Sequence, residues 1–398
     1  MRTLVPTISR SRIRTLVLTI CVTAVFASPT LATGVFARKA YLVSHESADV
    51  ATGALRAPCA RRLKILFRRR LSRGFAAYLS EKDREQLAAC VPGLTFEEDV
   101  EVTAQSNFWS SDRMNQRRLP LDEKLLSRDP TNGLGSIVRV FVLDTGVRRS
   151  HVEFEDVHFG VGANFVDDGF GGENADDCDG HGTHVASTIQ RIAYRGKTII
   201  HPVRVLDCHG NGELSALIAG LEWVERTVQT SNVPAVVSLA LGIKAGVWSR
   251  SLETVVESLD RRGVLIVSAA GNHQSDACEI SPGNIEATLT VSASDERDYV
   301  YAFANGGSCV DVLAPGVRIL GACAGYTTCD DPSDTSYAYQ SGTSMAVANA
   351  VGAASRVLSV APTTTPRALK EFLKSTATRG AVRGAMREHT PNLLVYVA

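Results

Sequence analysis

The feature of this sequence that most constrains its fold is an alternation of two hydrophobic patterns from Val138 onward. Short, nearly continuous apolar runs at 137–143, 203–206, 236–239 and 264–269 are typical of buried strands. Between them, apolar residues recur every three or four positions at 214–228 and 252–259, as in helices with one buried face. Strands that alternate with helices predict an α/β fold, in which a parallel, doubly wound sheet is flanked by helices.

Two polar residues follow strands of this expected sheet. Asp144 comes after the run at 137–143, and Asn272 comes after the run at 264–269. Active sites of open parallel sheets lie beyond the carboxyl ends of the strands. We therefore expect both residues at a catalytic edge.

Three glycine-flanked motifs carry the groups that nucleophilic hydrolysis requires. They are Asp144-Thr145-Gly146, His181-Gly182-Thr183-His184 and Gly342-Thr343-Ser344-Met345-Ala346. Attack by a serine needs a base for the hydroxyl proton, an acid that orients the base, and donors that face the oxyanion. Each motif alone is weak, but the order Asp, His, Ser is one of the known orders of a catalytic triad.

The segment at 38–101 predicts a separate, small α+β domain. Its strand candidates are 41–43, 64–67, 74–79 and 95–100, and the serine at Ser80, followed by acidic residues, reads as a helix start. The run of Arg68, Arg69 and Arg70 is either an exposed loop after a strand or a target for a processing protease, and we expect the loop. Residues 103–136 contain proline and glycine and predict a surface connection.

The amino-terminal segment has the pattern of a secretory signal. Four arginines precede an apolar run of about 12 residues at 16–27, whereas a membrane span needs about 20. An uncleaved anchor is the alternative. No later stretch is long and apolar enough to span a bilayer. We expect residues 1–27 to be a signal peptide and the product to be secreted to the extracellular space, without a membrane partner.

The net charge of zero hides an asymmetry between the two parts of the chain. Residues 1–103 carry 16 Lys and Arg against 9 Asp and Glu, while the remainder carries 26 against 33. A basic front segment and an acidic body are expected to attract each other. The basic residues form no concentrated face of the kind that binds nucleic acid, so we expect no nucleic-acid partner.

Nine cysteines point to disulfides rather than to a metal cluster. Eight remain without Cys21 of the signal segment, and an even number in an exported chain favours pairing. Three separations are suggestive: 31 residues for Cys59 and Cys90, 30 for Cys178 and Cys208, and 31 for Cys278 and Cys309. Cys323 and Cys329 could close a short loop, but spacing alone leaves the connectivity open.

The motifs and their surroundings resemble those of the subtilases, and within that family the proteinase K and aqualysin branch. The matching segments are 142–146, 179–186 and 341–346 around the three motifs, and 269–272 at a strand end. The resemblance implies a serine endopeptidase with Asp144, His181 and Ser344 as its triad. It also implies that Asn272 completes the oxyanion hole and that Ser344 starts a buried helix, whose dipole favours the oxyanion.

Two further segments resemble those that flank the substrate in this family. The first comprises Gly210, Asn211 and Gly212, and the second comprises Ser238, Leu239, Ala240, Leu241 and Gly242. The resemblance implies that a polypeptide substrate adds as a strand between them and is held largely by main-chain bonds. That mode favours broad specificity, with small or apolar side chains before the scissile bond. Ile243 stands where close relatives have glycine.

The front domain resembles the subtilase propeptide through the segment 74–80. The resemblance implies that residues 28–103 assist folding and then inhibit the enzyme as an intramolecular partner, while residues 104–398 form the peptidase domain. Cleavage by the enzyme itself is expected near Thr103 and Ala104. Relatives place disulfides much like Cys178–Cys208 and Cys278–Cys309. The pair Cys323–Cys329 rests on local spacing, and Cys59–Cys90 is expected to stay within the propeptide.

Catalysis of this kind needs no cofactor, but the resemblance implies a structural calcium ion. Its expected ligands are the Asp295 carboxylate and backbone carbonyls near Pro282 and Asn284, because calcium prefers hard oxygen ligands. The alternative is that Asp295 only caps a turn. We expect a monomer.

Several residues depart from the family pattern. Val347, Ala348 and Asn349 replace a usual Thr or Ser, Pro and His, and Ser187 replaces a glycine. These positions shape the helices behind the triad, and His184 is expected to be a packed core residue. The changed residues after Ala346 leave a second function open: a self-cleaving protein that keeps its propeptide bound and has little activity in trans. A dibasic convertase is disfavoured, because no conspicuous cluster of acids occurs in the segments expected to line its pocket.

Overall fold

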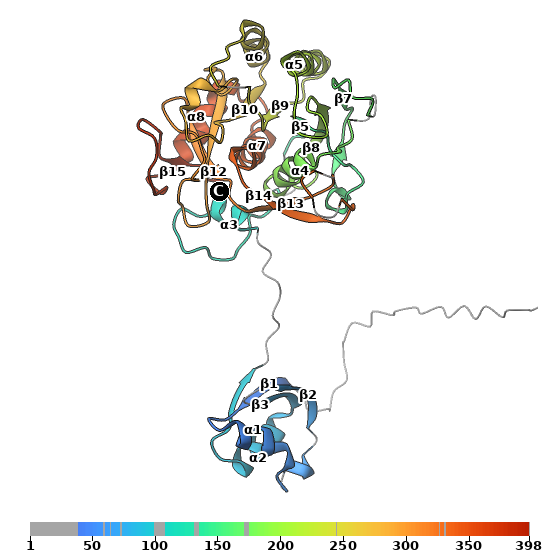
Figure 1. Ribbon diagram of the computed structural model, residues 1–398, viewed down its shortest axis with the longest axis vertical. Coiled ribbons are helices and arrows are strands. Elements are labelled where there is room, and N and C mark those ends of the chain that lie inside the picture. The colour runs from blue at the N-terminus through green and yellow to red at the C-terminus, as the bar shows by residue number, and fades with distance from the viewer. Residues whose placement is uncertain are drawn as a thin grey trace, which may run out of the picture. The chain divides into compact units, whose positions relative to one another are not determined.

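The computed structural model describes residues 39–397, apart from 59, 64, 72–73, 99–107, 131–134, 171–174, 244, 326 and 330–331. The chain divides into two compact units, Met1–Ala104 and Gln105–Ala398 (Figure 1). The predicted signal peptide at 1–27 and the predicted cleavage point near Thr103 lie outside the described residues.

The first unit is a small α+β domain. Its strands form one antiparallel sheet in the order β2-β3-β1-β4. The elements are β1 (Lys39–Ser44), α1 (Ala48–Gly53), two short 3₁₀ helices (Ala54–Arg56 and Ala60–Arg62), β2 (Leu66–Leu71), β3 (Gly74–Leu79), α2 (Glu81–Cys90) and β4 (Thr95–Glu98). Ser80 caps α2 by accepting a hydrogen bond from the backbone nitrogen of Asp83 at 3.1 Å, which confirms the predicted helix start.

The expectation of a loop at Arg68, Arg69 and Arg70 was wrong. These residues belong to β2, where Arg69 lies opposite Ala76 of β3. The register shifts between Phe67 and Arg69, which marks a bulge. A bulge admits an extra residue into one strand, so the pairing continues past the point where the apolar pattern stops.

The second unit is built around a ten-stranded, mainly parallel sheet in the order β15-β16-β12-β11-β10-β9-β5-β8-β6, with β7 also paired to β8. Its central strands are β5 (Val138–Asp144), β8 (Thr198–Arg204), β9 (Ala235–Leu239), β10 (Leu265–Ala269), β11 (Thr288–Ser294) and β12 (Val312–Pro315). The edge strands are β6 (His158–Phe159), β7 (Ala163–Asn164), β15 (Thr378–Arg379) and β16 (Leu393–Leu394). A separate hairpin consists of β13 (Ile319–Ala322) and β14 (Tyr337–Gln340).

Helices cover both faces of this sheet, as the doubly wound pattern predicts. One face carries α4 (His181–Ile192), α7 (Thr343–Val360) and α8 (Pro366–Thr376). The other face carries α5 (Leu214–Gln229) and α6 (Arg250–Arg261), which lie side by side in Figure 1. Two short 3₁₀ helices, Val152–Phe154 and Ala277–Glu279, occur in the loops. In the part of the chain that the structure describes, no helix has the length and apolarity needed to cross a membrane.

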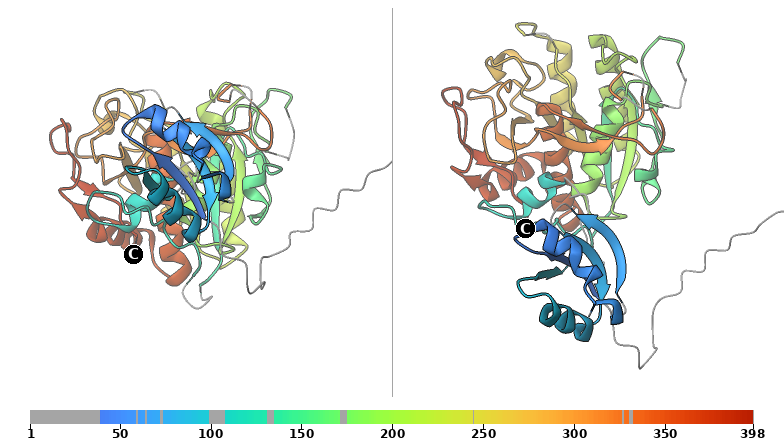
Figure 2. Two further views of the ribbon diagram at one scale, coloured as in Figure 1. Left: turned by 90° about the horizontal axis from the view of Figure 1, so that it is seen from below. Right: turned by 60° about the horizontal axis from the view of Figure 1, so that its bottom comes forward.

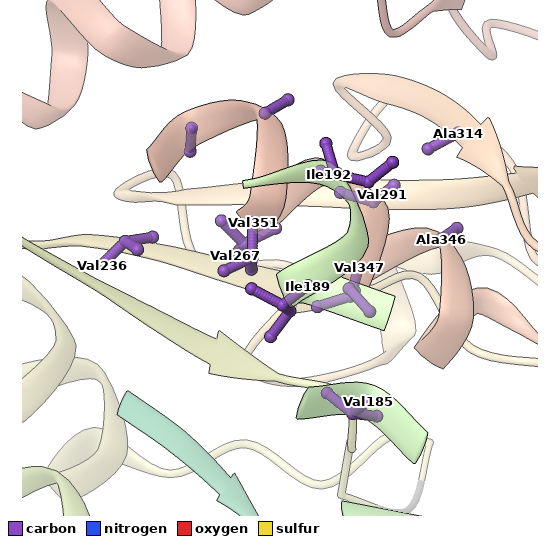
Figure 3. Close-up of a cluster of buried hydrophobic side chains, with 14 of the residues drawn as sticks. Val185, Ile189, Ile192, Val236, Val267, Val291, Ala314, Ala346, Val347 and Val351 are labelled. Carbon is purple, nitrogen blue, oxygen red and sulfur yellow. The ribbon is translucent and has the colours of Figure 1, made fainter. Parts of the chain in front are cut away.

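Alternate residues of the central strands contribute to two different cores. In β5, Val140 and Val142 join the core beneath α4 and α7, whereas Phe141 and Leu143 join the core beneath α5 and α6. Figure 3 shows the first of these cores, where side chains of α4 and α7 meet those of the strands. Burial on both faces explains why these strands are nearly continuous apolar runs in the sequence.

The connection at 103–136 is more than a surface segment. It contains α3 (Trp109–Asn115), in which Trp109 and Met114 are buried. Arg113 of this helix donates to buried Asp298, with Nε 2.6 Å from Oδ1. A helix of 7 residues is too short to be stable by itself, so tertiary contacts rather than a local pattern define it.

Three disulfides confirm the predicted pairings in the second unit. They are Cys178–Cys208, Cys278–Cys309 and Cys323–Cys329, with Cα–Cα distances of 4.9, 5.2 and 5.8 Å. Cys59 lies outside the described residues, so its pairing with Cys90 stays a prediction.

Candidate active site

Asp144 and His181 meet at the carboxyl edge of the sheet. Asp144 is the last residue of β5 and is fully buried, and His181 is the first residue of α4. The Nδ1 atom of His181 lies 2.8 Å from Asp144 Oδ1. Because the carboxylate accepts this bond, Nδ1 carries the hydrogen and the lone pair is left on Nε2. That tautomer is the one a general base requires.

Two glycines allow the chain after β5 and the start of α4 to approach this closely. Gly146 has a φ of 111°, a conformation that other residues rarely adopt. A side chain at Gly182 would collide with the Gly146 carbonyl and would place its Cβ 3.0 Å from the Cβ of Asp144. Glycine at 182 therefore lets α4 begin directly against Asp144.

Asp177 links the residue after Asp144 to the start of α4 through hydrogen bonds. Its buried carboxylate accepts hydrogen bonds from Thr145 Oγ1 and from the backbone nitrogens of Gly180 and Thr183, each at 2.9 Å. Burial raises the pKa of Asp177 to about 6, against the effect of these hydrogen bonds. Thr145 follows Asp144 and Thr183 lies in the first turn of α4, so this carboxylate helps to set the spacing of acid and base.

Negative charge around His181 makes it a stronger base. Burial lowers the pKa of the imidazole, but the charge and hydrogen bond of Asp144, together with the charges of Asp179 and Asp177, outweigh that effect. The result is a pKa of about 9. Asp179 also accepts a hydrogen bond from the backbone nitrogen of His181 at 3.0 Å.

Ser344 is the second residue of α7, a helix of 18 residues. Its hydroxyl donates to the carbonyl of Ala240 at 2.9 Å, just beyond the end of β9. Catalytic hydrogen bonds are often long or misaligned without substrate and tighten only in the complex. The amino terminus of α7 also places its positive dipole end at this point.

Asn272 follows β10 and is oriented by Thr343. The side-chain oxygen of Asn272 accepts hydrogen bonds from the backbone nitrogen of Thr343 at 2.9 Å and from its hydroxyl at 3.1 Å. The amide NH₂ group is therefore directed away from Thr343. Such a fixed donor beside a nucleophile is suited to bind an oxyanion.

A cleft of about 700 Å³ opens beside His181. Six of the predicted substrate-binding residues line it: Gly210, Asn211, Gly212, Ala240, Leu241 and Gly242. Ser238 and Leu239 instead lie inside β9, where they are buried and pair with β10. Their main chain is already used in the sheet, so they position Ala240 rather than border the cleft.

Sequence reasoning missed several residues of this lining. Leu214 and Val247 contribute apolar surface, and His209, Thr327 and Thr328 also border the cleft. The spacing of Leu214 indicates only the helix to which it belongs. The two threonines are far from His181 in the sequence, so no local pattern brings them to the site.

The residues that depart from the family pattern lie behind the triad. Val347 and Ala348 are fully buried and belong to the core beneath α7. Asn349 is also fully buried and donates from Nδ2 to the carbonyl of Pro315 at 2.9 Å. These side chains anchor α7 to the sheet, and their contacts are structural.

His184 is a packed core residue, as expected. Its Nε2 atom lies 2.9 Å from the carbonyl oxygen of Ile319, and burial lowers its pKa to about 3. Ser187 binds the same hairpin, because its hydroxyl oxygen accepts a hydrogen bond from the backbone nitrogen of Ala322 at 2.9 Å. Figure 2 shows this hairpin, in orange, beside α4. Both residues thus hold α4 against the strands that lead to Ser344.

The residues predicted to bind calcium do not come together. Pro282 and Asn284 precede β11, and the Pro282 carbonyl accepts a bond from Thr288 Oγ1 at 3.2 Å. Asp295 follows the other end of β11, a strand of 7 residues that spans roughly 20 Å. Its carboxylate accepts two backbone N–H groups of the following turn, at 2.9 and 2.7 Å. These residues therefore do not fit one shared ion.

A lysine occupies an oxygen cage near the start of β11. Lys370 of α8 donates to the carbonyls of Glu286 at 3.0 Å and Thr288 at 2.7 Å, and its Nζ lies 2.9 Å from Asp311 Oδ2. Lys374 lies 3.3 Å from the other oxygen of Asp311. Carbonyl and carboxylate oxygens are the ligands of hard cations. Here an ammonium group supplies the positive charge and ties α8 to β11 and to the residue before β12.

Known proteins resemble this chain over most of its length. The model described as "Subtilase family" matches residues 135–390. The extracellular serine proteinase of Thermus sp. (strain Rt41A) is 40% identical over 331 residues, which cover 81% of this chain and 75% of that protein. The alkaline serine exoprotease A of Vibrio alginolyticus is 37% identical over 290 residues, which cover 71% of this chain and 50% of that protein.

A solved structure is similar in fold as well. The crystal structure of a cold adapted subtilisin-like serine proteinase has a TM-score of 0.62 and 36% identity, and the match covers 72% of this chain and 97% of that one. This similarity confirms the predicted α/β class. The family match at 135–390 includes Asp144, His181, Asn272 and Ser344. The chain therefore belongs to the subtilase family and is a serine-type endopeptidase.

Proposed function

We propose that this chain is a secreted endopeptidase that cleaves proteins through an acyl-enzyme at Ser344 and is made as a self-processing zymogen. The observation that carries the proposal is the distance of 2.8 Å between His181 Nδ1 and Asp144 Oδ1. It leaves Nε2 as the base beside a cleft that also contains Ala240, the partner of the Ser344 hydroxyl. The chemistry uses no cofactor.

The proton moves between Ser344 and His181. His181 accepts the hydroxyl proton through Nε2 as the serine oxygen attacks the substrate carbonyl, and it then gives the proton to the leaving amine. Asp144 stabilises the imidazolium that exists between these steps. Water repeats the sequence on the acyl-enzyme and restores the free serine. The NH₂ group of Asn272 and the start of α7 stabilise the oxyanion in both halves.

The cleft supports a preference for small or apolar side chains. Its lining includes the apolar side chains of Leu206, Leu214, Leu241, Ile243 and Val247. The segments around Gly210–Gly212 and Ala240–Gly242 flank it and would bind the substrate main chain as an added strand. Hydrogen bonds to the substrate main chain do not depend on the identity of its side chains, so the specificity is broad.

The first unit is proposed to be the propeptide and to occupy the cleft after cleavage. The front segment has an excess of positive charge and the body an excess of negative charge. Exposed charge pairs add little each and are screened by salt, so shape must supply most of the affinity. The proposed secretion is supported by a relative named as extracellular, by the amino-terminal pattern and by the three disulfides.

The test is the turnover of casein by the purified mature protein. We expect hydrolysis by the wild type and none by Ser344→Ala, because loss of the nucleophile costs roughly a million-fold in another subtilase. The matched control is Ser215→Ala, an exposed serine of α5, which should retain full activity.

The same experiment separates the alternative function. A protein that releases its propeptide segment by cleavage but leaves casein intact would be a self-cleaving binding protein. A Ser344→Ala precursor that still matures would show that another protease processes this one.

A further inference from the structure

Two disulfide-closed loops meet beside His181. Cys178–Cys208 joins the segment before α4 to the loop after β8. Cys323–Cys329 closes a short loop after β13, with a sequence separation of 6. The contacts between these loops suggest a role for the second one that the triad does not require.

Both threonines of the second loop, Thr327 and Thr328, donate hydrogen bonds to backbone carbonyls of the first loop. Thr327 Oγ1 donates to the carbonyl of Cys208 at 2.6 Å. Thr328 donates to the carbonyl of Asp179 twice, from Oγ1 at 2.7 Å and from its backbone nitrogen at 3.2 Å. Asp179 in turn binds the backbone nitrogen of His181 at 3.0 Å. The short loop is thus linked to the catalytic histidine through a single residue.

Gly325, Thr328 and Cys329 of the short loop also lie close to the chain that precedes His181. Gly180 has a φ of 110°, and a side chain there would collide with Thr328 Oγ1 and approach Cys329 Sγ to 2.9 Å. A side chain at Gly325 would collide with the backbone of Asp179. Both glycines are therefore needed for this contact, which holds Thr328 and Cys329 directly against the residue before His181.

Two residues of the short loop border the cleft. Thr327 and Thr328 line it together with His181 and His209. The two hydroxyls already donate their hydrogens to carbonyls of the neighbouring loop, so neither acts as a donor to a substrate. The threonines therefore contribute shape at the part of the cleft nearest the catalytic histidine.

We propose that Thr327 and Thr328, held in the loop closed by Cys323–Cys329, form a steric filter that sets the size of the substrate side chain lying against His181. The inference rests on the proposed endopeptidase function. Successive side chains of an extended peptide point to opposite faces. The filter should therefore restrict alternate positions before the scissile bond and leave the intervening positions unaffected.

The test compares Cys323→Ala/Cys329→Ala with the wild type on fluorogenic peptides in which each of the four residues before the scissile bond is varied. Opening the loop should raise kcat/KM for Phe or Leu relative to Ala by roughly 10-fold at one position or at alternate positions. The double variant Thr327→Ala/Thr328→Ala keeps the disulfide and should give a smaller change of the same kind.

The matched control is Cys278→Ala/Cys309→Ala, because that disulfide does not line the cleft. It should lower the melting temperature without changing the size preference near His181. Peptide Kd values measured in a Ser344→Ala background repeat the comparison without turnover, so an inactive wild type would refute the proposed function separately. An unchanged preference in the loop variants, or an equal change at all four positions, would overturn the filter.

Discussion

Thr343 holds the side-chain oxygen of Asn272 with two hydrogen bonds, at 2.9 Å from its backbone nitrogen and at 3.1 Å from its hydroxyl. An amide whose oxygen is held in this way has its NH₂ group fixed in direction as well. Thr343 immediately precedes Ser344, so the first turn of α7 places both the proposed nucleophile and the proposed oxyanion donor. A donor placed in advance needs no reorganisation during the reaction.

Replacing Asn272 by Ala should reduce kcat by about 100- to 1000-fold, the loss known for the corresponding change in another subtilase, with little change in KM. The reason is that the amide binds charge that develops only in the transition state. Steady-state kinetics on one peptide measures both constants. Asn284→Ala, which removes an amide from a loop before β11, is the control. A loss expressed mainly in KM would contradict the role.

The activity should rise with pH through the pKa of His181, which lies at about 9. Below that pKa the imidazole is protonated and cannot accept the serine proton, so the acid side of the profile is inactive. A profile of kcat/KM against pH with an uncharged peptide measures it. Asp179→Asn should move this limb to lower pH, because it removes one charge that raises the pKa, whereas Asp295→Asn should not. A wild-type limb at 6.5 or below would refute the prediction.

His184 should make the domain less stable in acid. Its pKa is lowered to about 3 in the folded state, against 6.5 in the unfolded chain. The unfolded state therefore binds a proton first as pH falls below 6.5, and stability is lost by at most about 1.4 kcal/mol per pH unit down to pH 3. Urea unfolding of Ser344→Ala protein between pH 4 and 7 measures this slope. His184→Gln should flatten the slope, and a change at exposed His209 should not.

Lys370→Met should destabilise the peptidase domain by about 1–3 kcal/mol, because it removes the ammonium group that binds two backbone carbonyls and one oxygen of the largely buried Asp311. Lys374→Met should cost less, since this side chain is 30% exposed and makes its contact with Asp311 at 3.3 Å. Urea unfolding at fixed pH compares the two. Added calcium should recover part of the loss in Lys370→Met, because the vacated oxygens are ligands that calcium prefers. Equal losses of unfolding free energy in both variants would show that the carbonyl contacts of Lys370 do not add to stability.

The mature enzyme should begin within a few residues of Thr103. The chain reads Glu101-Val102-Thr103-Ala104-Gln105 there, so the cleft must accept a small or apolar residue before the bond if the enzyme cuts itself. Amino-terminal sequencing of secreted protein measures the site. A start at Leu71, after the arginines of β2, would point to a convertase instead.

The strands and helices around the site follow from local hydrophobic periodicity. Burial of β5 on both faces appears directly as a continuous apolar run, and one buried face of α5 appears as a helical repeat. Asp144 was recognisable because it follows such a strand, and His181 because its glycine-flanked motif stands in the order expected of a triad. Helix α3 was not recognisable, because a helix of 7 residues is too short to show a helical repeat.

Membership of the cleft could not be read in the same way. Ser238 and Leu239 match a substrate-binding segment, yet sheet pairing with β10 buries them and leaves only the residues after β9 at the cleft. Asp295 stands close to Pro282 in sequence, but β11 separates them in space. Thr327, Thr328 and Lys370 act through backbone carbonyls of distant segments. Periodicity and motif order are properties of neighbouring residues, whereas these contacts exist only after the chain has packed.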